Sequence, residues 1–134
     1  MTMTADQYRE QAKKQYSVYL EQCPAHQLLD TLSNKWVSLV LCALSDGAHR
    51  HSELRRVIAG VSQKMLTATL RTLERDGIID RQVLSAFPQH VEYRLTPLGA
   101  SLLPVVYGMK NWAEQNMSDV IEHRNRFDTD SFGQ

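Results

Sequence analysis

Long cations and small polar side chains recur at helical spacing in the middle third of the chain. Residues 60–79 read GVSQKMLTATLRTLERDGII, and at about 100° per residue the leucines fall on one side of a helix and the polar residues on the other. The polar side carries Lys64, Thr67, Ala68, Arg71 and Arg75. Cations that flank small residues suit a DNA major groove, where phosphates and base edges are both within reach. The alternative is an ordinary surface helix with a solvated basic face.

Each residue of this polar side has an expected role on DNA. Arg71 can donate two hydrogen bonds to a guanine, and Ala68 permits close approach or touches a thymine methyl group. Lys64 and Thr67 are expected to face the same groove. Arg75 either contacts DNA or pairs with a nearby carboxylate, and the sequence leaves both interpretations open.

Signals at both ends define this helix. Ser62 is placed to cap its first turn, and Asp76 with Gly77 ends it, because glycine tolerates the left-handed conformation that follows many helices. Ser62, Gln63 and the free amides at the helix start can hold a phosphate, helped by the helix dipole. The sequence therefore predicts DNA contacts at the start of the helix as well as along its side.

Cys23 is the residue best placed for thiol chemistry. It precedes Pro24 at the expected start of a helix, where the dipole favours a thiolate, and thiolates react with oxidants and electrophiles. The alternative is a buried, helix-capping cysteine without a chemical role. Cys42 lies in the apolar stretch KWVSLVLCAL and is expected to pack in the core. Because these two cysteines form no CxxC pair, we expect no zinc or other metal site, and in a reducing cytoplasm we expect no structural disulfide. We also expect no cofactor.

Periodicity and capping signals place these residues on short elements. They predict helices at residues 6–22, 25–32, 35–44, 52–58, 62–76 and 96–123. Two alternating segments, 79–84 and 91–95, predict a β-hairpin whose loop at 85–90 contains a proline. Pro104 is expected to kink the last helix. We expect a single domain over residues 1–134, with an N-terminal helix at 5–22, a core at 23–96 and a C-terminal helix at 97–125.

These elements predict a mainly α fold with a small β-hairpin, an α+β winged helix-turn-helix. A short turn at 59–61 joins two helices, and the hairpin that follows them is the wing. Five further residues are expected to contact the DNA backbone or minor groove: Arg55, Arg56, Arg81, Gln89 and His90. The last helix carries more apolar residues than one small domain can bury, so we expect the two terminal helices to form a homodimer interface. The alternative is that these residues cover their own core.

Charge and hydropathy limit the classes of function. The net charge is zero, but residues 50–81 carry +3 while the segments before and after them carry −1 and −2, which is an electrostatic footprint for nucleic acid. No segment has the pattern of a signal peptide or a membrane span, so we expect a cytoplasmic protein without a membrane partner. The sequence has no glycine-rich phosphate loop and no paired carboxylates, so we do not expect an enzyme.

From Cys23 to about Trp112 the chain resembles the HxlR-type winged-helix regulators, relatives of the MarR-like repressors. The matching motifs occur in one order over about ninety residues: CP at 23–24, KW at 35–36, SELRR at 52–56, SQKMLT at 62–67, LRTLERDG at 70–77 and VEYRLTPLG at 91–99. Pro104 and Trp112 follow them. The resemblance implies a winged fold, a homodimer that binds DNA, and a cysteine at position 23 that senses quinones, aldehydes or oxidants.

Three positions depart from the family pattern. The family usually has two glycines before Lys-Trp, where this chain has Ser33 and Asn34, and usually has phenylalanine where this chain has His51. Consecutive prolines are common at the wing tip, whereas Pro88 stands alone here. None of these departures removes a cation expected to face DNA.

The sequence therefore predicts a sequence-specific DNA-binding transcriptional regulator. We expect a homodimeric repressor of stress or detoxification genes that binds double-stranded DNA at an inverted repeat and senses oxidants or electrophiles through Cys23. One alternative is a winged-helix module for protein–protein interaction. Another is a regulator that answers to a small-molecule effector without a redox thiol, its site lined by Trp36, Tyr107 and Trp112.

Overall fold

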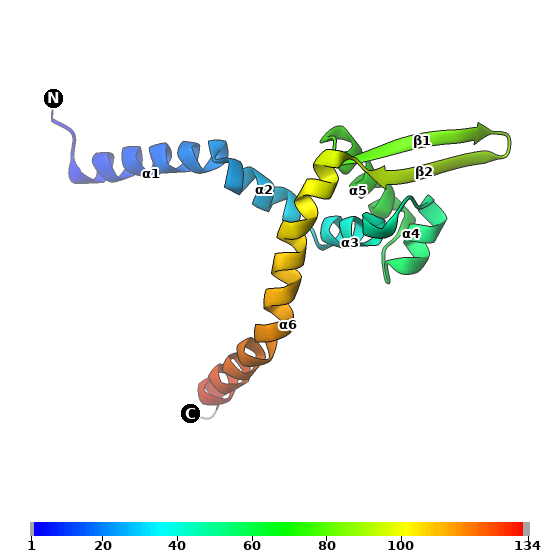
Figure 1. Cartoon of the computed structure of the whole chain (residues 1–134). Coiled ribbons are helices and arrows are strands. Elements are labelled where there is room, and N and C mark those ends of the chain that lie inside the picture. Colours follow the sequence, from blue (N-terminus) through cyan, green and yellow to red (C-terminus); the bar gives the residue numbers. More distant parts are fainter. Residues whose placement is uncertain (1, 133–134) are drawn as a thin grey trace. The chain divides into compact units, whose positions relative to one another are not determined.

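The computed structural model describes residues 2–132 and divides the chain into two compact units, Met1–Leu39 and Val40–Gln134. The helices are α1 (Ala5–Gln22), α2 (Pro24–Leu32), α3 (Lys35–Ala43), the 3₁₀ turn η1 (Leu44–Asp46), α4 (His51–Val57), α5 (Gln63–Arg75) and α6 (Pro97–Phe132). The strands β1 (Ile79–Ala86) and β2 (Gln89–Leu95) form an antiparallel pair (Figure 1). Among the described residues, no helix is both long and apolar enough to cross a membrane.

The first unit contains two consecutive helices. Thr4 and Gln7 cap α1 reciprocally, since the Gln7 amide donates to the Thr4 hydroxyl at 3.2 Å and the Thr4 amide donates to the Gln7 side chain at 2.8 Å. Pro24 starts α2 directly after Cys23, as expected from a residue that is favourable at the first helical position. The tyrosines of α1 are exposed, with Tyr8, Tyr16 and Tyr19 at 58%, 64% and 66%. This helix therefore leaves much of its apolar surface open.

The second unit contains the hydrophobic core, built from the inward sides of α3, η1, α4, α5, β1 and α6. Its buried apolar residues are Val40, Leu41, Leu44, Leu54, Ile58, Val61, Leu66, Leu70, Leu73, Ile79 and Val106. Burial of this branched aliphatic surface is the main stabilising term for a domain of this size. The leucine stripe of α5 supplies three of these side chains, as its periodicity predicts.

Helices α4 and α5 form the expected helix-turn-helix. Gly60 in the turn between them has φ +84°, a conformation that favours glycine. Ser62 caps α5, with its hydroxyl oxygen accepting from the Met65 amide at 3.0 Å. The prediction that Ser52 opens the preceding helix is wrong by one residue, because α4 begins at His51. The Arg50 amide donates to the Glu53 carboxylate at 3.3 Å, so Arg50 occupies the capping position.

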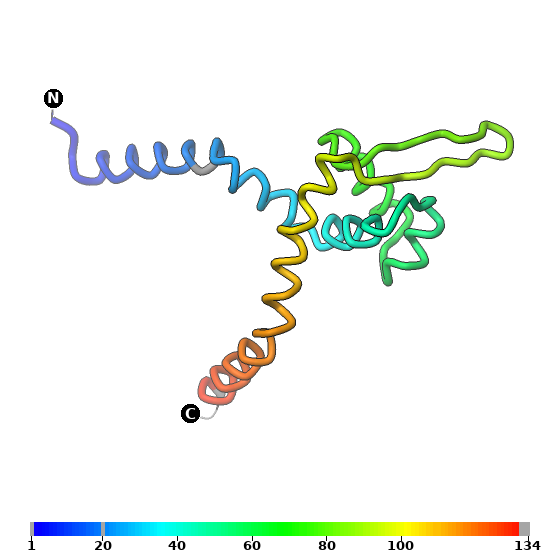
Figure 2. The backbone as a smooth tube through the Cα atoms, viewed as in Figure 1, coloured from blue at the N-terminus to red at the C-terminus, as the bar shows by residue number. Residues whose placement is uncertain are grey.

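The wing is longer than its sequence pattern predicts. Residues 85, 86, 89 and 90 join the ladder, so that only Phe87 and Pro88 remain between the strands (Figure 2). An irregularity between Val83 and Ser85 shifts the register, which disguises the continuation of β1 in the alternating pattern. The hairpin that follows α5 completes a winged helix-turn-helix, and the predicted fold class is confirmed.

The last helix also extends beyond its predicted end. The sequence pattern predicts an end at residues 123–125, but α6 continues to Phe132. An ion pair of 2.8 Å between Arg126 and Glu122, one helical turn apart, supports the added length, and residues 124–132 contain neither glycine nor proline. Pro104 lies inside the helix, and the kink expected there stays a prediction.

Candidate nucleic-acid interface

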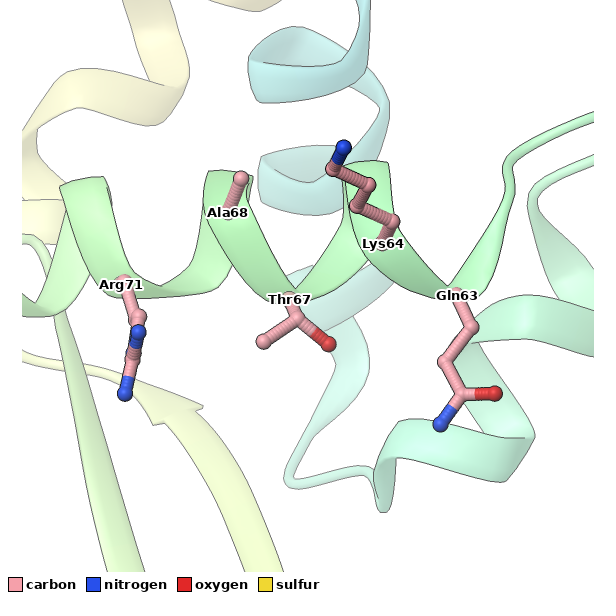
Figure 3. A pocket seen from close by; sticks show the side chains of 5 residues that line it. All are labelled: Gln63, Lys64, Thr67, Ala68 and Arg71. Carbon is pink, nitrogen blue, oxygen red and sulfur yellow. The ribbon is translucent and has the colours of Figure 1, made fainter.

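The outer face of α5 gathers the residues that the sequence singled out for DNA. Gln63, Lys64, Thr67, Ala68 and Arg71 line one open pocket with a volume of about 720 Å³. Gln63, Thr67 and Arg71 follow one another at four-residue intervals and project in a common direction, while Lys64 and Ala68 form the neighbouring row (Figure 3). The opposite face of the helix is buried in the core of the unit, so this face is free to meet a partner.

Seven lysines and arginines that have no ion pair among the described residues are concentrated in this region. Within residues 2–132, Arg9, Lys110 and Arg126 each pair with a carboxylate on their own helix. In the same described residues, none of the seven lysines and arginines between positions 50 and 81 makes an ion pair: Arg50, Arg55, Arg56, Lys64, Arg71, Arg75 and Arg81. The positive charge of the middle third is therefore available to an anionic partner.

Thr67 makes a contact that the sequence did not predict. The Nε2 atom of His51 lies 3.0 Å from the Thr67 hydroxyl oxygen, so the start of α4 restrains a side chain on the outer face of α5. Partial burial is the main cause of the lowered pKa of His51, and the positive charge of Arg55 lowers this pKa further. The neutral form of His51 is thus favoured beside α5. The sequence contains one sign of this contact, which is that His51 stands where the family usually has phenylalanine.

The remaining expected DNA contacts lie on α4 and on the wing. Arg55, Arg56, Arg81 and Gln89 are exposed. The Nε2 atom of His90 lies 3.0 Å from a carboxylate oxygen of Glu92 on the same strand, which partly compensates any charge on this imidazole. Among the described residues of α4 and the wing, the positive charges that no carboxylate compensates therefore belong to arginines.

A histidine that sequence reasoning missed holds the base of the wing. The backbone of His49 pairs with Tyr93 of β2, through hydrogen bonds of 2.9 and 2.8 Å. Its ring lies 3.0 Å from the Asp46 carboxylate and 3.3 Å from the Glu53 carboxylate. The hydrogen bond with Asp46 is the main cause that raises the pKa of His49, and Glu53 contributes to it. His49 thus links the wing, through its backbone, to η1 and α4, through its ring.

The two thiols are free and differ in setting. Cys23 is the capping residue of α2 and is partly exposed, and its side chain makes no capping hydrogen bond. Cys42 lies within α3 and is also partly exposed, less buried than a core position predicts. In the described part of the chain, no group of histidine, cysteine, aspartate and glutamate side chains could hold a metal ion.

Comparisons with known proteins agree with this geometry. The model of the family described as HxlR-like helix-turn-helix matches residues 31–121. The uncharacterized HTH-type transcriptional regulator YtfH of Escherichia coli strain K12 is 42% identical over 114 residues, which cover 85% of this chain and 90% of YtfH.

Two solved structures are similar in both sequence and fold. The redox regulator HypR in its reduced form is 42% identical with a TM-score of 0.70, and the match covers 75% of this chain and 99% of HypR. The quinone-bound YodB of Bacillus subtilis is 37% identical with a TM-score of 0.61, and the match covers 70% of this chain and 99% of YodB.

Proposed function

The chain belongs to the HxlR-like helix-turn-helix family, and from that premise we propose that it is a homodimeric repressor that reads an inverted-repeat operator with α5. Its relatives are transcriptional regulators of HTH type rather than enzymes, and this chain is a DNA-binding regulator of the same type.

The single observation that carries the proposal is the outer face of α5. Its small and polar residues line one open pocket between uncompensated cations, on a helix whose other face is anchored in the core. Helices of this kind enter the major groove in helix-turn-helix proteins, and the second helix reads the bases. In this arrangement Arg71 reads guanine, while Ala68 and Thr67 lie close to the base edges.

Residues around the reading helix have supporting roles in the proposed complex. Phosphate and minor-groove contacts fix the register of the protein on the duplex but carry little sequence information. The residues in this group are Arg55, Arg56, Ser62, Gln63, Arg81, Gln89 and His90, whereas Lys64 faces the major groove together with Thr67, Ala68 and Arg71.

Dimerisation is proposed from the exposed apolar residues of the terminal helices. In α6, Val105, Met109 and Trp112 recur at helical spacing and are 45%, 44% and 57% exposed. A twofold dimer places two reading helices roughly 34 Å apart, one turn of DNA, so its operator is an inverted repeat.

Cys23 is the proposed sensor of the inducing signal. It is a partly exposed thiol at the start of α2, and two similar proteins are a redox regulator and a regulator solved with bound quinone. An adduct or an intersubunit disulfide at this position would alter the spacing of the reading helices. The regulated genes would then be stress or detoxification genes.

We expect diamide to release the wild-type protein from its operator and to leave Cys23→Ser bound. Release of Cys23→Ser by diamide would remove the redox role.

The DNA-reading role is tested by two arginine variants. We expect Arg71→Ala to relax sequence preference, binding operator and mutated operator with similar affinity, because it removes a base contact. Arg56→Ala should weaken binding to all sequences and flatten the salt dependence, because it removes a phosphate contact. Gel-shift titrations at several salt concentrations measure both effects. If both variants bind operator DNA like the wild type, α5 and α4 do not have these roles, and a module for protein–protein interaction becomes the better interpretation.

A further inference from the structure

A second groove lies between the start of α4 and the wing, apart from the pocket on α5. Its volume is about 360 Å³, and its lining comprises Arg50, His51, Ser52, Arg81, Gln89, Val91 and Tyr93. Arg50 and Ser52 are among the lining residues that have no role in the DNA contacts proposed above. The groove is therefore lined by residues of α4, by the capping residue of α4 and by residues of the wing.

The sheet register explains why Arg81 faces this groove. Arg81 pairs with Tyr93 and Val83 pairs with Val91, so these four side chains share one face of the hairpin. Arg94 pairs with Asp80 and lies on the opposite face, where it hydrogen-bonds the Gln82 side chain. The two faces of the hairpin thus carry one arginine each, with only Arg81 turned toward α4.

Backbone hydrogen bonds hold the two walls of the groove in place. The pairing of His49 with Tyr93 fixes the segment before α4 against β2. One residue further along, an Arg50 guanidinium nitrogen donates to the Gln89 carbonyl at 3.4 Å, which brings this side chain across to the wing. Arg50 and Arg81 therefore approach the same space from two different elements.

The chemistry of the lining selects for an anion. It contains two arginines, a hydroxyl at Ser52 and a phenol at Tyr93, and none of the lining residues is a carboxylate. Guanidinium groups are always charged and present paired N–H donors that match phosphate oxygens. His51 adds no positive charge near neutral pH because burial lowers its pKa.

We propose that this groove binds a phosphate of the DNA backbone between Arg50 and Arg81, with the Ser52 hydroxyl donating to the same phosphate. The inference rests on the proposed function, since it takes DNA as the partner. It assigns a contact to Arg50 and Ser52, and it makes Arg81 a phosphate ligand rather than a reader of the minor groove. Such a contact sets the position of the wing on the duplex without selecting a sequence.

Three variants with the same change of charge test the proposal. Arg50→Gln and Arg81→Gln each remove one wall of the groove, whereas Arg94→Gln removes a cation from the opposite face of the same hairpin. Each phosphate that a variant no longer neutralises should make the slope of log Kobs against log salt shallower by about 0.9. We expect this change in Arg50→Gln and Arg81→Gln, while Arg94→Gln should keep the wild-type slope.

A methylphosphonate scan of the operator locates the contact. Neutralising the contacted phosphate should weaken the wild type and Arg94→Gln by roughly tenfold or more, the worth of a charge-assisted hydrogen bond. The same neutralised phosphate should weaken Arg81→Gln and Arg50→Gln much less, since each of these variants has already lost one of the two arginines that bind that phosphate. If all four proteins respond alike at every position, the groove does not hold a backbone phosphate and the inference is wrong.

A titration with inorganic phosphate at constant ionic strength separates a free anion from the DNA backbone. We expect no saturable binding to the wild type, because a single free phosphate lacks the rest of the duplex. Saturable binding that Arg81→Gln abolishes, combined with an unchanged methylphosphonate scan, would overturn the inference in favour of an anion site. Failure of the proposed function itself gives a different result, because the wild type would then bind no genomic fragment even at low salt.

Discussion

At the scale of single residues, the hydrogen bonds of the His49 ring depend on its protonation state. Its two ring nitrogens each face a carboxylate, Asp46 at 3.0 Å and Glu53 at 3.3 Å. A neutral imidazole has one N–H and can donate to only one of them, whereas an imidazolium donates to both. The raised pKa of His49 and the lowered pKa of each carboxylate follow from this arrangement.

The stability of the domain should therefore depend on pH through this residue. Because the folded pKa of His49 lies above its ordinary value of 6.5, its contribution is complete below pH 6.5 and is lost as the pH rises through the folded pKa. The carboxylates have lowered pKa values, so their contribution is lost only in acid, as the pH falls through those values. Replacing His49 by Asn should remove the decrease in stability on the alkaline side of pH 6.5.

Urea unfolding of the wild type and His49→Asn, at closely spaced pH values from 5.5 to about 8.5, measures this effect. A matched control is His123→Asn, which lies on α6, away from these carboxylates in sequence and outside every ion pair of the described residues. His123→Asn should keep the wild-type pH profile. If His49→Asn also keeps it, the protonated ring does not stabilise the domain by bridging the two carboxylates.

Side-chain spacing predicted the α5 face because one helix alone determines it. Lys64, Thr67, Ala68 and Arg71 share a side of the helix whatever surrounds it, and the structure places them in one pocket. The contact of Thr67 with His51 and the carboxylate partners of His49 were not predictable in the same way. Both depend on how α4 and the wing pack, and sequence periodicity contains no information on that packing.

At the scale of elements, the start of α6 is fixed by a close approach to the end of α5. The Thr96 hydroxyl donates to the Gly77 carbonyl at 2.6 Å and accepts from the Gly99 amide at 3.0 Å. A side chain at Gly99 would overlap the backbone carbonyl of Ile78. The glycine therefore serves the approach of α6 to the segment that leads into the wing.

Gly99→Ala and Gly108→Ala should have opposite effects on stability. Both glycines lie in α6, where alanine is favoured over glycine by roughly 0.5–1 kcal/mol. At Gly108 nothing obstructs a Cβ atom, so this substitution should stabilise the protein by about that amount. At Gly99 the overlap with Ile78 dominates, and overpacking of this kind costs about 1–3 kcal/mol.

Urea unfolding at one pH compares the two variants with the wild type. Equal gains in stability from both substitutions would show that α6 can move away from Ile78 without cost. A loss at Gly108 equal to that at Gly99 would contradict the open space around Gly108.

The ends of elements were less predictable than the elements themselves. The hairpin is longer than expected because cross-strand pairing extends into residues 85–90, and this pairing needs both strands in place. Helix α4 starts one residue early because Glu53 caps the Arg50 backbone rather than that of Ser52. Capping choices between neighbouring residues depend on the fold around them, so local signals locate a helix end only to within a few residues.

At the scale of the whole molecule, the proposed function depends on two copies of the chain acting together. A single reading helix contacts too few base pairs for a specific site, whereas two linked half-sites bind with an affinity that far exceeds either one. The exposed row on α6 formed by Val105, Met109 and Trp112 is the surface that we propose for this association. Apolar side chains of this size in a row on one helix are typical of helix–helix contacts.

Trp112→Glu should disrupt the dimer and weaken operator binding together. A carboxylate at this position would lose the apolar contact area of the indole and would have to be desolvated in the interface. We expect a shift from dimer to monomer in analytical ultracentrifugation, and a loss of affinity for the full inverted repeat of about 10²-fold or more. Affinity for an isolated half-site should remain near that of the wild type, since α5 is unchanged.

Asn111→Glu is the matched control, because it adds the same charge to an exposed, polar position next to Trp112. It should remain dimeric and bind the full operator like the wild type, apart from a small effect of net charge. A dimeric Trp112→Glu that binds the inverted repeat normally would exclude this row of α6 from the interface and would turn the search toward the exposed tyrosines of α1. A wild-type protein that is monomeric yet binds the full operator tightly would instead remove the requirement for two copies.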